Sequence, residues 1–353
     1  MPCRRAAGRR AAQTCAVLGG SRNPQRHACL SDLCLLDWSL PPQTCCRVGR
    51  DLLSCPCTKD AACGRTCGSM TTRFLPTHWR DYALLDAGHG KRLERFGEVT
   101  VVRPDPFALW LPAGDPQAWK QADATFEPSG RTHGKWRTAP GTPKRWPLRY
   151  RSEALDLAFE LEMTQFKHVG LFPEQADNWE FIAANLQEGD KFLNLFAYTG
   201  GASLAARHVG ADVIHCDAIR QVVDWTRKNM ERSGLDGIRW VVEDALKFAR
   251  REAKRGNTYQ GIVLDPPTWG LGPKGEKWKL EDQILDLIDV VASLVAPGGF
   301  VVMNTYSGIP PSALETMWAL ALPGASIQSG ELCLRTELGH DLSTGSLVRV
   351  QRH

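Results

Sequence analysis

The sequence lacks both a long apolar run and a secretory leader. No stretch approaches the roughly 18 uninterrupted apolar residues that a membrane-spanning helix needs. The opening segment, MPCRRAAGRRAAQ, has no apolar core of the kind found in signal peptides. We therefore expect a soluble, cytoplasmic protein without membrane contact. A secreted disulfide framework is disfavoured for the same reason.

Cysteine is nearly absent from most of the chain. Ten of the twelve cysteines lie in residues 1–69, and only Cys216 and Cys333 follow. No CxxC pairs recur at zinc-finger spacing, so we expect no metal site. A disordered leader or a wrongly assigned start explains residues 1–69 most simply. The six arginines and the absence of acids in residues 1–31 leave an organelle-targeting segment as the alternative.

The net charge gives no general argument for a nucleic-acid partner. The chain carries a formal charge of +4, but residues 1–69 contribute +6, from ten basic and four acidic residues, which leaves −2 for the remainder. Only a local basic patch can therefore support such a partner.

One basic patch is predicted at residues 131–151, which contain no acid. Its basic and aromatic members are Arg131, Lys135, Trp136, Arg137, Lys144, Arg145, Trp146, Arg149 and Arg151, with a single tyrosine besides. Positive charge combined with stacking planes suits single-stranded or unstacked RNA. A solvated hairpin whose tryptophans pack on the core explains the same pattern, so both interpretations remain open.

The composition divides the rest of the chain in two. The segment from Thr71 to Glu162 is dense in Pro, Gly and Trp and contains short alternating runs, which predict a β-rich, substrate-binding subdomain over residues 70–165. Residues 166–353 alternate apolar runs with helical stretches. Within them we expect a strand at Phe166–Phe172 and a helix start at Pro173.

Four apolar runs in residues 166–353 end in Gly or Asp. The first, KFLNLFAYTGG, enters a Gly-Gly turn that opens a helix, and the others lead to Asp217, Asp244 and Asp265. Strands separated by helices predict an α/β fold with a Rossmann-like, doubly wound sheet, whose carboxyl edge gathers these residues. Because a carboxylate at a strand end can accept both hydroxyls of a ribose, we expect a ligand that contains a nucleoside.

The expected ligand carries no phosphate. The chain has YTGGAS where a dinucleotide site would show GxGxxG, and it has no GxxxxGK[ST] loop; GLGPKGEK near Gly272 is only superficially similar. S-adenosylmethionine fits, because it needs a Gly-rich turn for its methionine part and acids for its ribose and its adenine amine. Gln175, at the expected helix start, could contact the carboxylate or amine of this cofactor.

The DPPTW element is the candidate reactive edge. Two prolines after a strand fix the backbone so that the Asp265 carboxylate points outward, and Trp269 can stack on a flat substrate. The alternative is that the prolines only end the strand and the tryptophan belongs to the core. We favour the functional interpretation, because the element follows the fourth strand. The catalytic candidates are Asp265, Pro266, Pro267 and Trp269.

These motifs, together with NTYSG at residues 304–308, resemble the class I S-adenosylmethionine-dependent methyltransferases (EC 2.1.1.-). The resemblance covers about Phe166 to Ser307 and is to the branch of 23S ribosomal RNA methyltransferases that make methylcytosine or methylguanosine. It implies rRNA methylation and a cofactor-binding set at Gln175, Phe196, Ala197, Tyr198, Thr199, Gly200, Gly201, Asp217, Asp244 and Ala245. The candidate substrate contacts are Arg137, Lys144, Arg145, Trp146 and Tyr306.

Two departures from the family bear on the reaction. Members that methylate cytosine C5 carry a nucleophilic cysteine after the fifth strand, where this chain has Tyr306 and Ser307. The usual N-terminal RNA-binding appendage is not recognisable. We therefore expect methylation of a base nitrogen in RNA, with ribosomal RNA as the first candidate. The alternatives are a methyltransferase for protein or a small molecule, and a non-catalytic RNA module that binds the cofactor.

Overall fold

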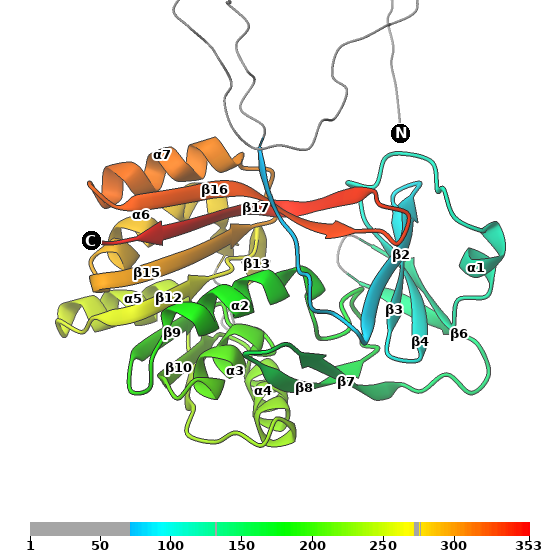
Figure 1. Cartoon of the computed structure of the whole chain (residues 1–353), viewed down its shortest axis with the longest axis horizontal. Coiled ribbons are helices and arrows are strands. Elements are labelled where there is room, and N and C mark those ends of the chain that lie inside the picture. Colours follow the sequence, from blue (N-terminus) through cyan, green and yellow to red (C-terminus); the bar gives the residue numbers. More distant parts are fainter. Residues whose placement is uncertain (1–70, 131–132, 272–274, 276) are drawn as a thin grey trace, which may run out of the picture. The chain divides into compact units, whose positions relative to one another are not determined.

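The computed structural model describes residues 71–130, 133–271, 275 and 277–353. These residues lie in a single compact unit (Figure 1). The expected leader at residues 1–69, Arg131 of the basic segment and Gly272 of the phosphate-loop-like run lie outside the described residues. None of the helices in the described part is long and apolar enough to cross a membrane.

An eight-stranded sheet forms the centre of the fold. Its strands are β1 (Thr72–Phe74), β9 (Lys191–Leu195), β10 (Asp212–Asp217), β11 (Arg239–Val242), β12 (Tyr259–Leu264), β15 (Val295–Thr305), β16 (Ser326–Arg335) and β17 (Asp341–Gln351). Their spatial order is β1-β16-β17-β15-β12-β9-β10-β11. The run from β15 to β11 is parallel, whereas β17 is antiparallel to both β15 and β16.

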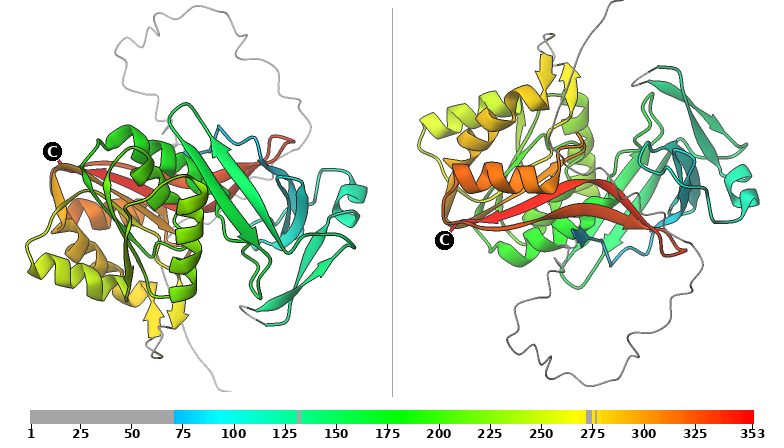
Figure 2. Two further views of the ribbon diagram at one scale, coloured as in Figure 1. Left: turned by 90° about the horizontal axis from the view of Figure 1, so that it is seen from below. Right: turned by 90° about the horizontal axis from the view of Figure 1, so that it is seen from above.

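Helices cover both faces of this sheet (Figures 1 and 2). They are α2 (Ala176–Asn185), α3 (Gly201–His208), α4 (Arg220–Arg232), α5 (Ala245–Lys254), α6 (Leu280–Ala292) and α7 (Pro311–Ala321). Successive strand residues point to opposite faces. Phe192 packs in the cluster that contains α2 and α3, and Leu193 packs in the cluster that contains α5, α6 and α7. The expected doubly wound α/β sheet is confirmed.

The parallel register brings the strand ends together. Leu195 at the end of β9 pairs with Cys216 of β10 on one side and with Leu264 of β12 on the other, and Asp217 pairs with Val242 of β11. The turns that follow these strands therefore lie at one edge of the sheet, as expected from right-handed crossovers.

The β-rich part, also as expected, precedes every strand of this sheet except β1 along the chain. A five-stranded sheet, β2-β3-β4-β5-β6, and a hairpin, β7-β8, make up most of it. The elements are β2 (Tyr82–Gly88), β3 (Lys91–Phe96), β4 (Val99–Pro104), α1 (Pro116–Lys120), β5 (Ala124–Pro128), β6 (Gly134–Thr138), β7 (Arg145–Arg151) and β8 (Asp156–Glu162). A short hairpin of β13 (Trp269–Leu271) and β14 (Lys277–Lys279) follows β12. The domain division at residues 165 and 166 stays a prediction.

One expected strand is wrong. Residues 166–172 form no strand, and the 3-10 turn η1 (Pro173–Gln175) follows them. Two of their carbonyls accept side-chain donors: Trp136 donates to Phe166 O, and Thr199 donates to Gly170 O. Val169 O makes a single backbone contact, with the N–H of Glu162, and no ladder follows from it. Gly170 has a φ of 99°, which takes the chain out of the extended conformation. The helical start at Pro173 is confirmed.

Candidate functional site

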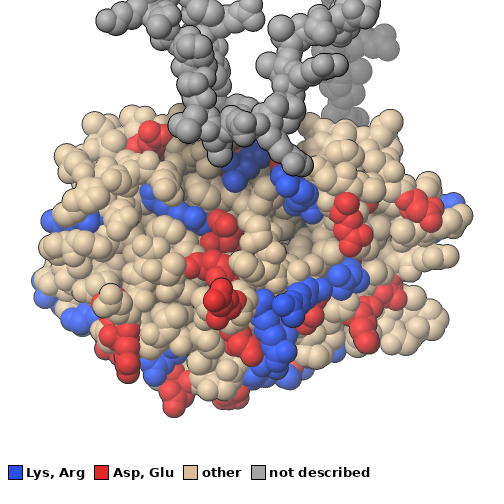
Figure 3. Space-filling view, viewed as in Figure 1, with Lys and Arg blue, Asp and Glu red and all other residues tan. Residues whose placement is uncertain are grey.

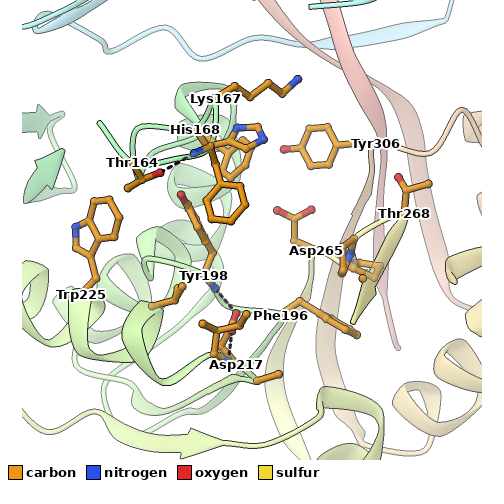
Figure 4. A pocket seen from close by; sticks show the side chains of 18 of the residues that line it. Thr164, Lys167, His168, Phe196, Tyr198, Asp217, Trp225, Asp265, Thr268 and Tyr306 are labelled. Atoms are coloured by element: carbon orange, nitrogen blue, oxygen red, sulfur yellow. Dashed lines mark hydrogen bonds between the residues drawn. The ribbon is translucent and has the colours of Figure 1, made fainter. Parts of the chain in front are cut away.

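A cavity of about 1270 Å³ lies at the carboxyl edge of the parallel strands. The ends of β9, β10 and β12 supply one side of it, and Arg92 and Asp105 of the β-rich part supply another. Figure 4 shows Tyr198, Asp265 and Tyr306, which follow different strands, around the same space. A ligand bound at the strand ends therefore also meets the β-rich part of the chain.

The turn after β9 has a strained backbone. Phe196 and Tyr198 adopt positive φ angles of 56° and 48°, which residues with a side chain rarely do. Gly200 has a φ of 87°, and a Cβ atom there would lie 2.1 Å from Cγ2 of Thr226. The turn therefore needs glycine at position 200, and α3 begins at the next residue. Phe196 and Tyr198 line the cavity.

Asp217 holds this turn in place. Its carboxylate accepts hydrogen bonds from the backbone N–H groups of Tyr198, at 3.0 Å, and of Ile219, at 2.9 Å. Burial raises the pKa of Asp217, and these two hydrogen bonds oppose the rise. The lone pairs that remain on its oxygens can accept ribose hydroxyls, because Asp217 also lines the cavity.

Asp244 and Ala245 stand at the start of α5. The Asp244 carboxylate accepts a hydrogen bond from Lys247 N at 2.8 Å and so caps the helix. Both residues line the cavity, as does the half-exposed, apolar Ile219. This combination of an acid and an apolar surface suits an adenine ring. No basic residue occurs in the turn at residues 196–201, which suits a ligand without phosphate.

Asp265 reaches the cavity from the end of β12 (Figure 4). Neither of its oxygens has a hydrogen-bond partner among the described residues, and Oδ1 is fully buried. Burial, and then the nearby Glu174, raise the pKa of Asp265 to about 8. A carboxyl group with this pKa can exchange a proton near neutral pH.

The rest of the DPPTW element supports this side of the cavity. The carbonyl of Pro267 accepts a hydrogen bond of 2.6 Å from Trp278 Nε1, which fixes the backbone after Asp265. Pro266 and Trp269 line the cavity, and 55% of the Trp269 surface is exposed. The tryptophan is therefore not a core residue, and its ring is available for stacking.

Gln175 and several residues of the turn do not line the cavity themselves. Gln175 donates a hydrogen bond of 3.0 Å to the hydroxyl of Tyr306 and accepts one from Asn178. Tyr306 does line the cavity. Five predicted cofactor contacts lie behind the residues that line the cavity and do not line it themselves: Gln175, Ala197, Thr199, Gly200 and Gly201. Direct contact between these residues and the cofactor stays a prediction.

The predicted substrate contacts of the basic segment are dispersed. Arg145 lines the cavity, whereas Arg137 and Lys144 do not. All three pair with acids, Arg137 with Glu127 and the other two with Glu162. On the face in Figure 3, basic and acidic side chains are interleaved.

Trp146 corrects one prediction. It is 6% exposed, packs in the core and donates its indole N–H to the carbonyl of Phe96 at 3.0 Å. Its ring therefore cannot stack on a base, and the packing interpretation holds for this residue. The strand alternation of β7, in which every second residue is buried, places it there.

Sequence reasoning missed three polar residues in the cavity wall, of which two are buried and one, His168, is half-buried. They are Arg92, His168 and Glu174. Burial, followed by the nearby cations Arg103, Lys167 and Arg92, lowers the pKa of His168 well below its usual value. No motif marked Arg92 or His168, and the position of Glu174 in a helix start gave it an ordinary structural explanation.

The strained glycine turn, the acids at successive strand ends and the cavity they share define a nucleoside-binding α/β enzyme. No family model matches the chain. It is similar to the crystal structure of a SAM-dependent methyltransferase from Agrobacterium tumefaciens, with 34% identity and a TM-score of 0.74 over 80% of this chain and 94% of that one. The chain therefore belongs to the S-adenosylmethionine-dependent methyltransferases, and the predicted enzyme class and cofactor are confirmed.

Two curated relatives are both ribosomal RNA methyltransferases. Ribosomal RNA large subunit methyltransferase K/L of Syntrophotalea carbinolica is 30% identical over 177 residues, or 47% of this chain and 24% of the relative. Ribosomal RNA large subunit methyltransferase I of Aeromonas hydrophila is 32% identical over 148 residues, or 41% of this chain and 37% of the relative. The matched region therefore spans well under half the length of each relative.

Proposed function

We propose that this enzyme methylates a nitrogen of an RNA base and that large-subunit ribosomal RNA is its substrate. The names of the curated relatives support the substrate. The reaction follows from the side chains around the cavity. The cofactor supplies an electrophilic methyl group; the turn at residues 196–201, Asp217, Asp244 and Ala245 would hold it.

The environment of Asp265 is the observation that supports this proposal most strongly. It lies at the cavity, has no hydrogen-bond partner among the described residues and has a pKa raised to about 8 by burial and Glu174. A nitrogen that gains a methyl group loses a proton, and the Asp265 carboxylate can accept it. Transfer to nitrogen needs this acceptor and in-line positioning of the lone pair, but no nucleophile.

The described cysteines do not suit attack on cytosine C6. Cys216 and Cys333 are buried, and neither lines the cavity. Burial, the largest cause, and neighbouring acids raise the pKa of both thiols, that of Cys333 to about 12. A thiol with a raised pKa is a poor nucleophile. These two side chains therefore favour nitrogen over the C5 carbon.

Exposed aromatic side chains around the cavity suit an unstacked RNA strand. Phe107 is 47% exposed and Phe166 is 41% exposed, and both line the cavity together with Trp269. Stacking of bases on aromatic side chains is a sequence-tolerant source of affinity for single-stranded nucleic acid. It replaces the role that we predicted for Trp146.

One observation favours a second candidate function, methylation of a protein or a small molecule. Eight Asp or Glu side chains line the cavity against four Lys or Arg side chains. An excess of acid repels phosphates and attracts a neutral or cationic acceptor. A third possibility is an RNA module that binds the cofactor without turnover. Any methyl transfer to an acceptor would exclude it.

A methyl-transfer assay distinguishes these functions. The full chain would be given cofactor with a tritiated methyl group and, separately, total RNA lacking modifications or protein extract. Label in RNA supports the proposed function, and digestion to nucleosides identifies the product. Label in protein alone supports the second candidate. Cofactor binding without label in either acceptor would contradict RNA and protein as substrates and would favour a small-molecule acceptor or the non-catalytic module.

A further inference from the structure

The outer edge of β8 pairs with side chains of α4. Within the described residues, β7 and β8 form a two-stranded sheet, so the far edge of β8 presents backbone groups that need other partners. The amide of Glu160 donates to Oδ1 of Asn229 at 2.9 Å, and the Glu160 carbonyl accepts from Trp225 Nε1 at 2.8 Å. The amide of Ala158 donates to Oγ of Ser233, directly after α4, at 2.9 Å. Side chains of α4 therefore hold β8 where a neighbouring strand would.

The same helix holds the turn after β9. Thr226 Oγ1 donates to the carbonyl of Tyr198 at 2.8 Å, and Nδ2 of Asn229 donates to the carbonyl of Thr199 at 3.0 Å. Thr226 and Asn229 are fully buried. A positive φ such as that of Tyr198 persists only where the surroundings stabilise it. The two contacts from α4 therefore help to keep the turn in its strained conformation.

Asn229 contacts both structures with one carboxamide. Its orientation is determined, because a backbone N–H can only donate and a carbonyl can only accept. The carboxamide oxygen therefore faces β8, and the nitrogen faces the turn. Of the other three side chains named above, Trp225 and Ser233 hydrogen-bond to β8 but not to the turn, and Thr226 does the reverse.

The two structures that Asn229 joins face the same cavity. Tyr198 of the turn lines it, and so do Glu160 and Glu162 of β8. β8 also fixes the position of β7, on which Arg145 pairs opposite Glu162 and lines the cavity as well. A movement of the turn would shift the predicted cofactor contacts, and a movement of β8 would shift a predicted substrate contact.

Resting on the proposed function, we propose that Asn229 is a positioning residue that couples the cofactor site to the RNA site. A bound cofactor orders the turn, and the carboxamide of Asn229 then restricts the motion of β8. The hairpin loses less conformational entropy when RNA binds, so each ligand strengthens the binding of the other by the same factor. Asn229 acts through its neighbours, because it is fully buried and does not line the cavity.

Hydrogen exchange tests the coupling without any acceptor. Amide exchange of β8 would be measured by mass spectrometry on the full chain, with and without saturating S-adenosylhomocysteine, the demethylated form of the cofactor. We expect this ligand to slow exchange in β8 at least about fivefold, the lower end of typical coupling between sites. Equal exchange of β8 with and without the ligand in the wild type would overturn the proposal.

Two variants of Asn229 assign the coupling to its carboxamide. Asn229→Leu has a similar shape but lacks both hydrogen bonds, and Asn229→Asp keeps an acceptor for Glu160 while its ionised form lacks the donor to Thr199. At saturating ligand, we expect the slowing in β8 to fall below about twofold in each folded variant. Circular dichroism and calorimetric binding of S-adenosylhomocysteine show which variants are folded.

Ser233→Ala is the matched control. It removes a contact between α4 and β8 but does not touch the turn. Exchange in β8 should become faster overall, whereas its slowing by the ligand should stay at the wild-type factor. A purely structural role of Asn229 would give the same result in the Asn229 variants as in Ser233→Ala, and that outcome would contradict the assignment.

RNA affinity separates this inference from the proposed function. An unmodified transcript of large-subunit ribosomal RNA would be titrated into the full chain with and without S-adenosylhomocysteine. We expect the ligand to raise RNA affinity at least about fivefold in the wild type and in Ser233→Ala, but less than about twofold in Asn229→Leu. Absence of RNA binding, together with the expected exchange results, would contradict RNA as the acceptor and retain the coupling. RNA binding of equal affinity with and without the ligand in the wild type would retain RNA as a ligand and overturn the coupling.

Discussion

The small β-sheet and the carboxyl edge of the large sheet each bury a carboxylate, with opposite electrostatic results. In the small sheet, burial alone would raise the pKa of Glu94, but Arg103 and Arg92 lower it. Arg103 donates two hydrogen bonds to Glu94, of 2.7 Å and 2.8 Å. At the sheet edge, burial and Glu174 raise the pKa of Asp265 to about 8, and no cation of the described residues lowers it.

This difference in partners and in pKa shows how a structural carboxylate can be distinguished from a functional one. Glu94 has all the partners that a buried charge needs, so it contributes to the packing of β3 against β4. Asp265 has no hydrogen-bond partner among the described residues. An unsatisfied acid with a shifted pKa, placed at a cavity, is the signature expected of a group that acts on a ligand.

The largest expected effect is on Asp265. Asp265→Asn removes the proton acceptor and should lower kcat/KM for methyl transfer by about 10²–10⁴-fold. Cofactor affinity should stay within a factor of about three. Asp224→Asn, an exposed acid at the cavity rim, is the matched control. Steady-state kinetics and cofactor titration measure both quantities. A kcat/KM equal to that of the wild type in Asp265→Asn would contradict the functional role of this carboxylate.

Glu94 should affect stability instead of chemistry. Glu94→Ala leaves Arg92 and Arg103 buried without their shared partner and should lower the free energy of unfolding by about 3–5 kcal/mol. Urea denaturation measures this change. Asp156→Asn, which disrupts an exposed ion pair with Arg149, should change stability little. A Glu94→Ala protein as stable as wild type would show that the cluster is not structural.

Gly200 tests the cofactor turn. Gly200→Ala places a methyl group 2.1 Å from Thr226 in a left-handed conformation and should destabilise the turn by about 1–3 kcal/mol. We expect a weaker affinity for S-adenosylhomocysteine, measured by calorimetry. Gly189→Ala is the control, because Gly189 also has a positive φ but has open space around it. Equal cofactor affinity in the two variants would place the cofactor elsewhere.

The raised pKa of Asp265 predicts two pH profiles. If the carboxylate is the base, kcat/KM should rise about tenfold per pH unit and level off above about 8.

Stability should depend on pH in the opposite sense. The pKa of Asp265 is about 8 in the folded state and 3.8 in the unfolded state, so the folded protein holds this proton more tightly. The stability that the protonated group contributes is therefore complete below pH 3.8 and is lost as the pH rises through about 8. The melting temperature of Asp265→Asn should therefore rise relative to that of the wild type over this pH range. A flat profile in both measurements would contradict the shift.

The smallest effects concern the basic segment. Arg145→Ala combined with Arg149→Ala should raise KM for RNA a few-fold and lower the slope of log affinity against log salt by about one per arginine. Both arginines are exposed and paired with acids, so stability should change little. Arg335→Ala, an exposed arginine paired with Asp341, is the control. Unchanged RNA affinity would favour the protein or small-molecule acceptor.

Four core strands, the helices between them and the gathering of Asp217, Asp244 and Asp265 at one edge were predictable from the sequence. The physical reason is local: apolar runs specify buried parallel strands, and the handedness of the crossovers places their ends together. The glycine turn before α3 was also foreseeable, because Gly200 is the residue that accepts its positive φ.

Which polar and aromatic residues face a ligand depends on the tertiary structure. Trp146 is buried because β7 turns that side toward the core, and the arginines of the basic segment meet acids from neighbouring strands that lie outside its sequence window. Arg92, Glu174 and Asp265 line one cavity because segments that are about 80 residues or more apart in sequence pack together. Local patterns carry no information about such long-range pairings, and these pairings set the charge and the hydrogen-bonding capacity of the cavity.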